Sequence, residues 1–438
     1  MIKILGRTTA AVLTAAALTA VPAVALAAGV DPPAVTDSAD PGTSWTVEKT
    51  ISTPEIPPMP DIVLVVDATG SMGGAINNVK AEMGTIVSTV QGAQPAAQFA
   101  VVSYRDVGDG PSVFTVHSDL SGDQPTVQAA VNSIFASGGG DEPEAQLNAL
   151  WQIGDGGDAI GFRADSSRIV VWFGDAPGHD PSLGHTEADA IASLQAVEAS
   201  VIAISVGANR LDLTGQATRI TDATDGSLTS GIPADGVAAA ILAGLSNLPA
   251  EVTADTTCDA GLSVSFNPAL PQTVPSGTDL VLQETITVAA DATQGAELTC
   301  TTSFLINGAD AGEDFVQTVT ITVNDITPPT IQCGPGVNPD GVTPGGWKNA
   351  GFFQMVAADN LPGVTVSISD NETGTSFGPY AAGTYFKLTQ APGSTPSVVP
   401  FTGAVDWHFT FPGDATLTAT DAAGNTATAT CSVPPKKK

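Results

Sequence analysis

Four short apolar runs, separated by stretches with helical spacing, are the feature that most constrains the fold. The runs are IVLVV at 62–66, QFAVVSY at 98–104, RIVVWFG at 168–174 and SVIAISVG at 200–207. After the first run, apolar residues recur every three or four positions, which is the period of an amphipathic helix. Those residues are Ile76, Val79, Met83, Ile86 and Val90. Continuous apolar strands that alternate with helices predict an α/β doubly wound domain, which we place at residues 58–250.

The pattern changes after this domain. Apolar and polar residues alternate, and Pro, Gly and Asp separate the runs, as in DLVLQETITV at 279–288. Such alternation predicts half-buried antiparallel strands. We expect two all-β sandwiches of immunoglobulin type, at residues 251–326 and 327–438. Residues 28–57 are rich in Pro, Ser, Thr and Asp, so we expect a linker there.

Four cysteines, Cys258, Cys300, Cys333 and Cys431, all lie in this second half. Spacing alone leaves their three possible pairings open and matches no zinc pattern. In an exported chain disulfides are the default. By their places in the expected strands, Cys258 would link to Cys300, and Cys333 to Cys431.

Residues 1–27 have the pattern of a secretory signal peptide, with Lys3 and Arg7 before an apolar stretch that ends in Ala25-Leu26-Ala27. We therefore expect a secreted or cell-surface protein, with no transmembrane segment once this peptide is removed. The formal net charge of the whole chain is -31. Such a surface repels phosphate backbones, so we expect no nucleic-acid partner.

The turn after the first apolar run places Asp67, Thr69 and Ser71 at alternate positions before the first helix. A phosphate-binding loop would end in Gly-Lys-Ser/Thr, and this turn has no lysine. A nucleophile elbow needs glycine two positions before the serine, where Thr69 stands. Three oxygen-bearing side chains fit a hard divalent cation, although an ordinary helix N-cap gives a similar pattern.

Two further loops carry acids at the ends of other expected elements. SGGGDEPEA at 137–145 contains Asp141 and Glu144, and the strand at 168–174 is followed by Asp175. Ligands of open parallel sheets bind beyond the carboxyl ends of the strands. Three acidic loops at that edge would repel one another unless a cation lay among them. The pattern thus favours a metal site.

The turn Asp67-Ala-Thr-Gly-Ser71, together with GGGDEPEA, resembles the von Willebrand factor type A family, in particular its hemicentin and integrin β-subunit type members. The resemblance implies a metal-ion-dependent adhesion site whose ligands would be Asp67, Thr69, Ser71, Glu144 and Asp175. Thr69 stands at the middle position of the Asp-x-Ser-x-Ser motif. Many members supply a threonine from the second loop, and here Glu144 takes that role. Asp141 matches a residue of a second cation site in integrin β-type domains.

The segments TPPTIQC (327–333) and TATDAAGNTATATC (418–431) resemble hyalin-repeat and bacterial immunoglobulin-like modules. We expect an adhesion or protein-interaction protein, not an enzyme. It would bind the Asp or Glu carboxylate of an extracellular partner protein through Mg²⁺, with Ca²⁺ or Mn²⁺ as alternatives. An extracellular metal-dependent hydrolase, or a structural surface protein with a vestigial metal site, are the other hypotheses.

Overall fold

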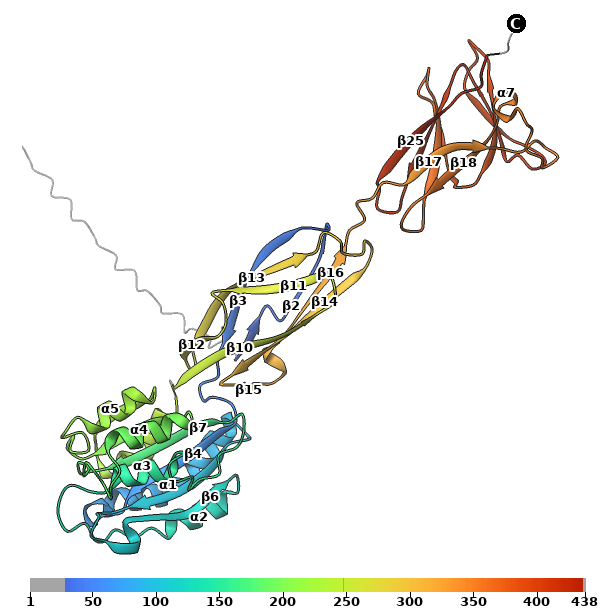
Figure 1. Cartoon of the computed structure of the whole chain (residues 1–438). Helices are drawn as coiled ribbons and strands as arrows, with labels where there is room; N and C mark the ends of the chain where they lie inside the picture. Colours follow the sequence, from blue (N-terminus) through green and yellow to red (C-terminus); the bar gives the residue numbers. More distant parts are fainter. Residues whose placement is uncertain (1–27, 247, 436–438) are drawn as a thin grey trace, which may run out of the picture.

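The computed structural model describes residues 28–246 and 248–435, which form one α/β domain and two β-sandwich modules (Figure 1). The expected signal peptide, residues 1–27, lies outside the described residues. Within the described ranges, no helix combines the length and the apolar character needed to cross a bilayer.

A six-stranded sheet forms the centre of the α/β domain, in the order β6-β5-β4-β7-β8-β9. All neighbouring strands run parallel except β5 and β6, which are antiparallel. The strands are β4 (Pro60–Asp67), β5 (Gln98–Tyr104), β6 (Phe114–Ser121), β7 (Ser167–Gly174), β8 (Ser200–Val206) and β9 (Ser227–Ile232). The four strands expected from the apolar runs are thus confirmed, and the more polar β6 and β9 extend the sheet at its two edges.

Helices cover both faces of this sheet, because side chains of its central strands alternate between two apolar clusters. Ile62, Leu64 and Val66 of β4 pack on one face, and Val63 and Val65 on the other. The first face is covered by α1 (Gly73–Ala93), α2 (Gln124–Asn132) and α6 (Val237–Gly244), the second by α3 (Gln146–Ile153), α4 (Glu187–Ala196) and α5 (Gln216–Ala223). Short 3₁₀ segments are η1 (Gly70–Met72), η2 (Gly110–Val113) and η3 (Ala234–Gly236). The predicted doubly wound domain is confirmed.

The linker expected at residues 28–57 is wrong, because this segment forms strands of the middle module. It contains β1 (Gly29–Asp31), β2 (Ala34–Ala39) and β3 (Ser44–Ser52). Strand β3 pairs with β13 over nine residues, and β2 pairs in parallel with β16. Most of the Ser, Thr and Asp residues in these strands are exposed, while Ile51 is fully buried. Middle-module strands therefore precede and follow the α/β domain, which is inserted between β3 and β10.

The middle module is a sandwich of two sheets, ordered β1-β3-β13-β11 and β12-β10-β14-β16-β2, with β15 paired to β14. Its later strands are β10 (Pro249–Cys258), β11 (Leu262–Asn267), β12 (Gln272–Pro275), β13 (Asp279–Val288), β14 (Glu297–Ile306), β15 (Ala309–Asp310) and β16 (Val316–Val323), with 3₁₀ segment η4 (Glu313–Phe315). Two apolar clusters between the sheets form its core. Since β10 begins at Pro249, the expected boundary after residue 250 falls inside a strand.

The C-terminal module is a second two-sheet sandwich, ordered β17-β18-β21-β23-β22 and β20-β19-β24-β25. Its elements are β17 (Thr330–Pro335), α7 (Trp347–Ala350), β18 (Phe352–Ala358), β19 (Thr365–Asp370), β20 (Ser376–Ala381), β21 (Tyr385–Gln390), β22 (Ser397–Pro400), β23 (Trp407–Phe411), β24 (Ala415–Thr420) and β25 (Thr426–Cys431). Buried aromatic residues such as Phe386 and Phe409 pack between its sheets. That the two modules are of immunoglobulin type stays a prediction.

Both expected disulfides are present. Cys258 and Cys300 face each other in register on neighbouring strands β10 and β14 of one sheet. Cys333 of β17 and Cys431 of β25 join the two sheets of the C-terminal module. The first bond therefore reinforces one strand pair, whereas the second fastens the start of its module to the end.

Candidate functional site

The site lies at the carboxyl end of β4, the strand at the centre of the parallel sheet. Asp67 ends this strand and is fully buried. Its Oδ1 accepts hydrogen bonds from the backbone N–H of Thr69 at 2.9 Å and from Thr69 Oγ1 at 2.7 Å. Its Oδ2 is equally buried and has no hydrogen-bond partner among the described residues. An unpaired buried carboxylate oxygen is costly, and this atom is available as a ligand.

Asp175 follows β7, the strand next to β4, and is joined to the same turn. Ser71 Oγ donates a hydrogen bond of 2.9 Å to Asp175 Oδ1, and Ser71 Oγ lies 3.5 Å from Thr69 Oγ1. Gly174, immediately before Asp175, has no room for a side chain, since a Cβ there would lie 2.6 Å from Tyr104 Oη and 3.0 Å from Asp67 Oδ2. The predicted residues of the first and third loops therefore form one continuous polar cluster.

Glu144 comes from the second predicted loop, and the backbone fixes it against the loop after β7. Its N–H donates to Pro177 O and its carbonyl accepts from the N–H of His179, both at 2.9 Å. Its side chain is 4% exposed, and Oε2 is buried without a partner among the described residues. Two carboxylates of one cluster, Asp67 and Glu144, thus each present an unpaired buried oxygen.

Gly139 shows how close the second loop comes to the first. A Cβ at this position would lie 2.8 Å from Thr69 Cβ and 2.9 Å from Glu144 Oε1, and the φ angle of Gly139 is +71°. The N–H of Gly70 also donates to Gly138 O at 3.3 Å. The glycine run therefore lets the loop pass between Thr69 and Glu144, which a side chain would prevent.

Residues of all three loops line a cavity of about 350 Å³ at the sheet edge, although Asp67 itself is not one of them. Asp141, the residue expected to hold a second cation, lines it too and is exposed, so that second site stays a prediction. Arg210, from the loop after β8, pairs with Glu142 at the cavity. The remaining lining residues are Thr69, Gly70, Ser71, Gly138, Gly139, Glu144, Asp175 and Ala176.

Without a cation, the acids of the site hold their protons more tightly than usual. Burial raises the pKa of Asp67 to about 7, and the Thr69 hydrogen bonds only partly oppose this. Burial, together with the charges of Asp67, Asp106, Asp109 and Asp175, raises the pKa of Glu144 to about 8. Burial also raises the pKa of Asp175. A bound divalent cation would reverse these shifts, because it favours the ionised carboxylates.

Two acids of the loop after β5 belong to the cluster and were missed by the sequence analysis. Asp109 Oδ2 accepts hydrogen bonds from the N–H of Gly139 at 2.9 Å and of Asp106 at 3.3 Å. Asp106 is buried, and its Oδ1 lies 3.1 Å from His179 Nε2. Asp106 comes shortly after the apolar strand β5, and Asp175 comes directly after the apolar strand β7. This shared position could have identified Asp106 as a site residue from the sequence.

The residues present fit a hard divalent cation. Carboxylate and hydroxyl oxygens from three loops converge, and within the described ranges two of the carboxylate oxygens have no hydrogen-bond partner. The hydroxyls of Thr69 and Ser71 are neutral, so they would occupy coordination positions on a bound dication without adding to the negative charge of the acids. This is the chemistry that the arrangement offers.

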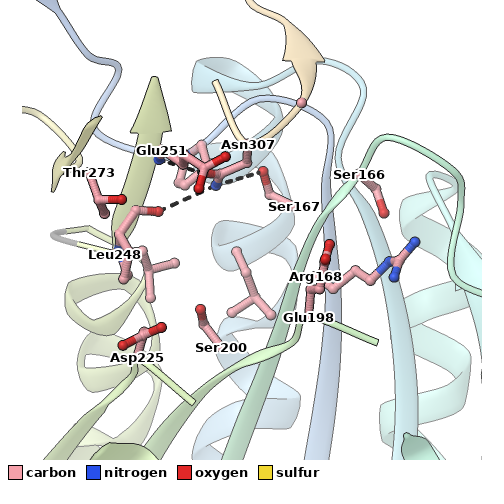
Figure 2. A pocket seen from close by; sticks show the side chains of 14 residues that line it. Ser166, Ser167, Arg168, Glu198, Ser200, Asp225, Leu248, Glu251, Thr273 and Asn307 are labelled. Atoms are coloured by element: carbon pink, nitrogen blue, oxygen red, sulfur yellow. Dashed lines mark hydrogen bonds between the residues drawn. The ribbon is translucent and has the colours of Figure 1, made fainter. Parts of the chain in front are cut away.

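A larger cavity, of about 440 Å³, lies at the opposite end of the sheet, where the α/β domain meets the middle module (Figure 2). It is lined by the first residues of β7 and β8 and by Asn307 of the middle module. Asn307 Nδ2 donates to Ser167 Oγ and to Pro249 O, each at 3.3 Å. The bond to Ser167 links the middle module to the α/β domain, and the cavity is separate from the acidic cluster.

A third group of acids, Asp325, Asp359 and Asp421, lies between the middle and C-terminal modules, with one oxygen of each within 4.8 Å of the others. Neighbouring donors already bind all three of them, and the N–H of Leu361 donates to Asp359 Oδ2 at 3.3 Å. Asn425 donates its N–H and Nδ2–H to Asp421 at 2.8 and 2.9 Å, and the N–H of Thr327 donates to Asp325. Turn hydrogen bonding accounts for much of this group, and we assign no ion to it.

Comparison with known proteins places the α/β domain in a family. A family model described as von Willebrand factor A domain matches residues 61–224. Mouse von Willebrand factor A domain-containing protein 7 is 40% identical over 97 residues, and the human protein is 37% identical over 97 residues. Each match covers 22% of this chain and 10% of the relative. An ariadne-like RING finger protein of Acanthamoeba polyphaga mimivirus is 32% identical over 122 residues, which are 28% of this chain and 11% of that protein.

Among solved structures, a von Willebrand factor type A protein from Catenulispora acidiphila is similar over 67% of this chain and 72% of its own, with 14% identity and a TM-score of 0.34. Proximal thread matrix protein 1 from the mussel byssus is similar over 46% of this chain and 47% of its own, with 17% identity and a TM-score of 0.34. The chain spans about a tenth of the length of the curated relatives that it matches. Residues 61–224 form a von Willebrand factor A domain.

Proposed function

We propose that this protein is an extracellular adhesion or interaction protein, whose von Willebrand factor A domain binds a partner's carboxylate through a divalent cation. The observation that carries the proposal is the pair of buried, unpartnered oxygens, Asp67 Oδ2 and Glu144 Oε2, beside the hydroxyls of Thr69 and Ser71. A cation among these atoms would satisfy both oxygens and neutralise the repulsion between the acids.

Each residue has a separate part in this proposal. Thr69 and Ser71 would offer neutral oxygens to the ion, while Asp67, Glu144 and Asp175 would supply charge, Asp175 directly or through water. Mg²⁺ requires near-octahedral oxygen coordination and retains some of its water. A partner's Asp or Glu side chain would replace one such water at the cavity. The proposal assigns no catalytic step to these residues.

The setting of the domain supports an extracellular role. Both disulfides are typical of an oxidising compartment. The signal-peptide pattern of residues 1–27 agrees with export. The two sandwich modules would then hold the metal-site domain away from whatever anchors the chain.

Calorimetric titration of the metal-free protein with Mg²⁺, Ca²⁺ and Mn²⁺ tests the proposal directly. We expect one site at the acidic cluster, lost in Asp67→Ala and retained in Glu82→Gln, which changes an exposed acid on α1. Capture of partners from native extracellular material should then require the cation and fail with EDTA and with Asp67→Ala. Equal metal uptake by wild type and Asp67→Ala would refute the assignment.

A further inference from the structure

A lysine is completely buried in the core of the middle module. Lys49 of β3 has no exposed side-chain surface, and neither has its neighbour Glu284 of β13. Gln317 of β16 is also fully buried, and it belongs to the facing sheet. Apolar residues of both sheets form the core around them. Lysine is almost never fully buried unless it is paired, so this group requires an explanation.

The three side chains meet at one oxygen atom. Glu284 Oε2 lies 3.5 Å from Lys49 Nζ and accepts a hydrogen bond of 2.7 Å from Gln317 Nε2. Lys49 Nζ also donates to Pro32 O at 2.7 Å. The remaining oxygens, Glu284 Oε1 and Gln317 Oε1, are buried and have no partner among the described residues. As a purely structural ion pair, this group is therefore poorly satisfied.

The same three side chains could supply a nucleophile, an acyl donor and a proton carrier. Burial lowers the pKa of Lys49, although the Glu284 carboxylate opposes the shift, and this favours the neutral amine, which is the nucleophilic form of lysine. A carboxamide is an acyl donor whose leaving group is ammonia. Here the amide nitrogen of Gln317 and the amine of Lys49 both lie at Glu284 Oε2. One carboxylate can therefore take a proton from the nucleophile and give it to the leaving group.

We propose that Lys49 and Gln317 form an intramolecular amide bond, with Glu284 as the proton carrier. Lys49 Nζ attacks Gln317 Cδ, and Glu284 accepts a proton from the attacking nitrogen. Glu284 then protonates Gln317 Nε2, the bond between Cδ and Nε2 breaks, and one molecule of ammonia leaves. The product is a neutral secondary amide, and the step requires no oxidant, cofactor or other reactant. It also removes an ionisable amine from the apolar core.

Gln317 is a better acyl donor than Glu284. Condensation of Lys49 with Glu284 would have to expel an oxygen of a carboxylate, which is a much poorer leaving group than an amide nitrogen protonated by a neighbouring acid. Glu284 also contacts both other groups through the same oxygen, which suits proton transfer. The two routes release different molecules, ammonia and water, so a mass measurement distinguishes them.

The bond would join the two sheets of the middle module. It would also close the segment from Lys49 to Gln317 into a covalent ring that contains the α/β domain. The α/β domain is inserted between β3 and β10, so it lies entirely between Lys49 and Gln317 in the sequence. A pulling force from β2 to the C-terminal module would then pass through the amide and by-pass the inserted domain. The metal site would keep its shape under a load that separates the ends of the protein.

The test is the mass of the full chain under denaturing and reducing conditions. The measured mass of the wild-type chain should be lower than the mass calculated from its sequence by one ammonia molecule. Proteolysis should give a linked peptide containing both Lys49 and Gln317, with tryptic cleavage blocked at Lys49. Lys49→Arg preserves the positive charge, and Glu284→Gln preserves the size of the side chain. Both variants should have the full mass calculated from their sequences and should give no linked peptide. Lys348→Arg, at an exposed lysine, should retain the mass deficit.

Three results would overturn the proposal. Wild type with its full sequence mass would show a structural ion pair only. A deficit of one water molecule, with a peptide joining Lys49 to Glu284, would show the other acyl donor. An ammonia deficit that persists in Lys49→Arg would place the loss elsewhere in the chain. The measurement on wild type alone decides the first two, so it does not depend on whether either variant folds.

Discussion

Ser71 Oγ donates a hydrogen bond of 2.9 Å to Asp175 Oδ1, although 104 residues separate the two in the sequence. They meet because β4 and β7 are parallel neighbours whose loops leave the sheet at the same edge. The bond orients the Asp175 carboxylate toward the turn that also holds Asp67. The arrangement of the site is therefore preformed by the protein, even where the carboxylates repel one another.

Asp67→Asn should abolish cation binding and stabilise the metal-free protein. The substitution removes a buried carboxylate whose pKa is raised to about 7, and with it the cost of ionising that group near neutral pH. We expect a gain of about 1–3 kcal/mol in the free energy of unfolding at pH 8 in EDTA. Urea denaturation with and without Mg²⁺ measures both effects. A variant that is less stable than wild type in EDTA would contradict this explanation.

The metal-free protein should lose stability as the pH rises from about 4 to about 8. Asp67 and Glu144 have folded-state pKa values of about 7 and about 8, above their ordinary values of 3.8 and 4.5. The folded protein therefore binds more protons than the unfolded chain within this window, so raising the pH favours unfolding. Below the ordinary values both states are protonated, and the penalty disappears.

Mg²⁺ should oppose this loss, because it binds the ionised carboxylates, and its affinity should rise over the same pH range. Denaturation midpoints measured in EDTA and in saturating Mg²⁺ should therefore diverge with increasing pH. At 100 times the dissociation constant, the cation should add about 2.7 kcal/mol. Parallel curves at all pH values would show that these acids do not hold the ion.

Gly139→Ala should weaken cation binding at least tenfold, whereas Gly140→Ala should leave it almost unchanged. A Cβ at Gly139 would collide with Thr69 and approach Glu144 Oε1, while one at Gly140 has no atom within 4 Å. Gly139 also has a φ of +71°, which costs a residue with a side chain about 1–2 kcal/mol. Calorimetric titration of both variants checks the prediction, and equal affinities would mean that the loop relaxes freely.

Replacing Cys333 and Cys431 by serine should destabilise the C-terminal module alone. Their bond closes a separation of 98 residues and joins the two sheets of this module. We expect a loss of about 2–5 kcal/mol in the unfolding of that module, with Mg²⁺ binding at the metal-site domain unchanged. Calorimetric scanning with Mg²⁺ present should show one unfolding transition moved to a lower temperature. If the metal-dependent transition moved equally, the modules would not unfold independently.

Local sequence pattern was enough for much of the fold. The apolar runs of the α/β domain predicted β4, β5, β7 and β8, because a strand buried on both faces needs apolar residues at every position. The polar edge strands β6 and β9 carry no such signal and were missed. The segment from 28 to 57 was misread for a related reason, since half-exposed strands such as β2 and β3 have the composition of a linker.

The sequence by itself determined the residue types of the candidate metal site and their positions at strand ends, because a strand that ends in an acid delivers that acid to the sheet edge. Tertiary structure alone decided which of these groups share a cluster. It added Asp106 and Asp109, and it left one oxygen each of Asp67 and Glu144 buried and unpaired. It also brought Lys49 against Glu284 and Gln317, which no local pattern indicates. Their meeting depends on the pairing of β3 with β13 and on the packing of two sheets whose strands are separated in the sequence by an inserted domain.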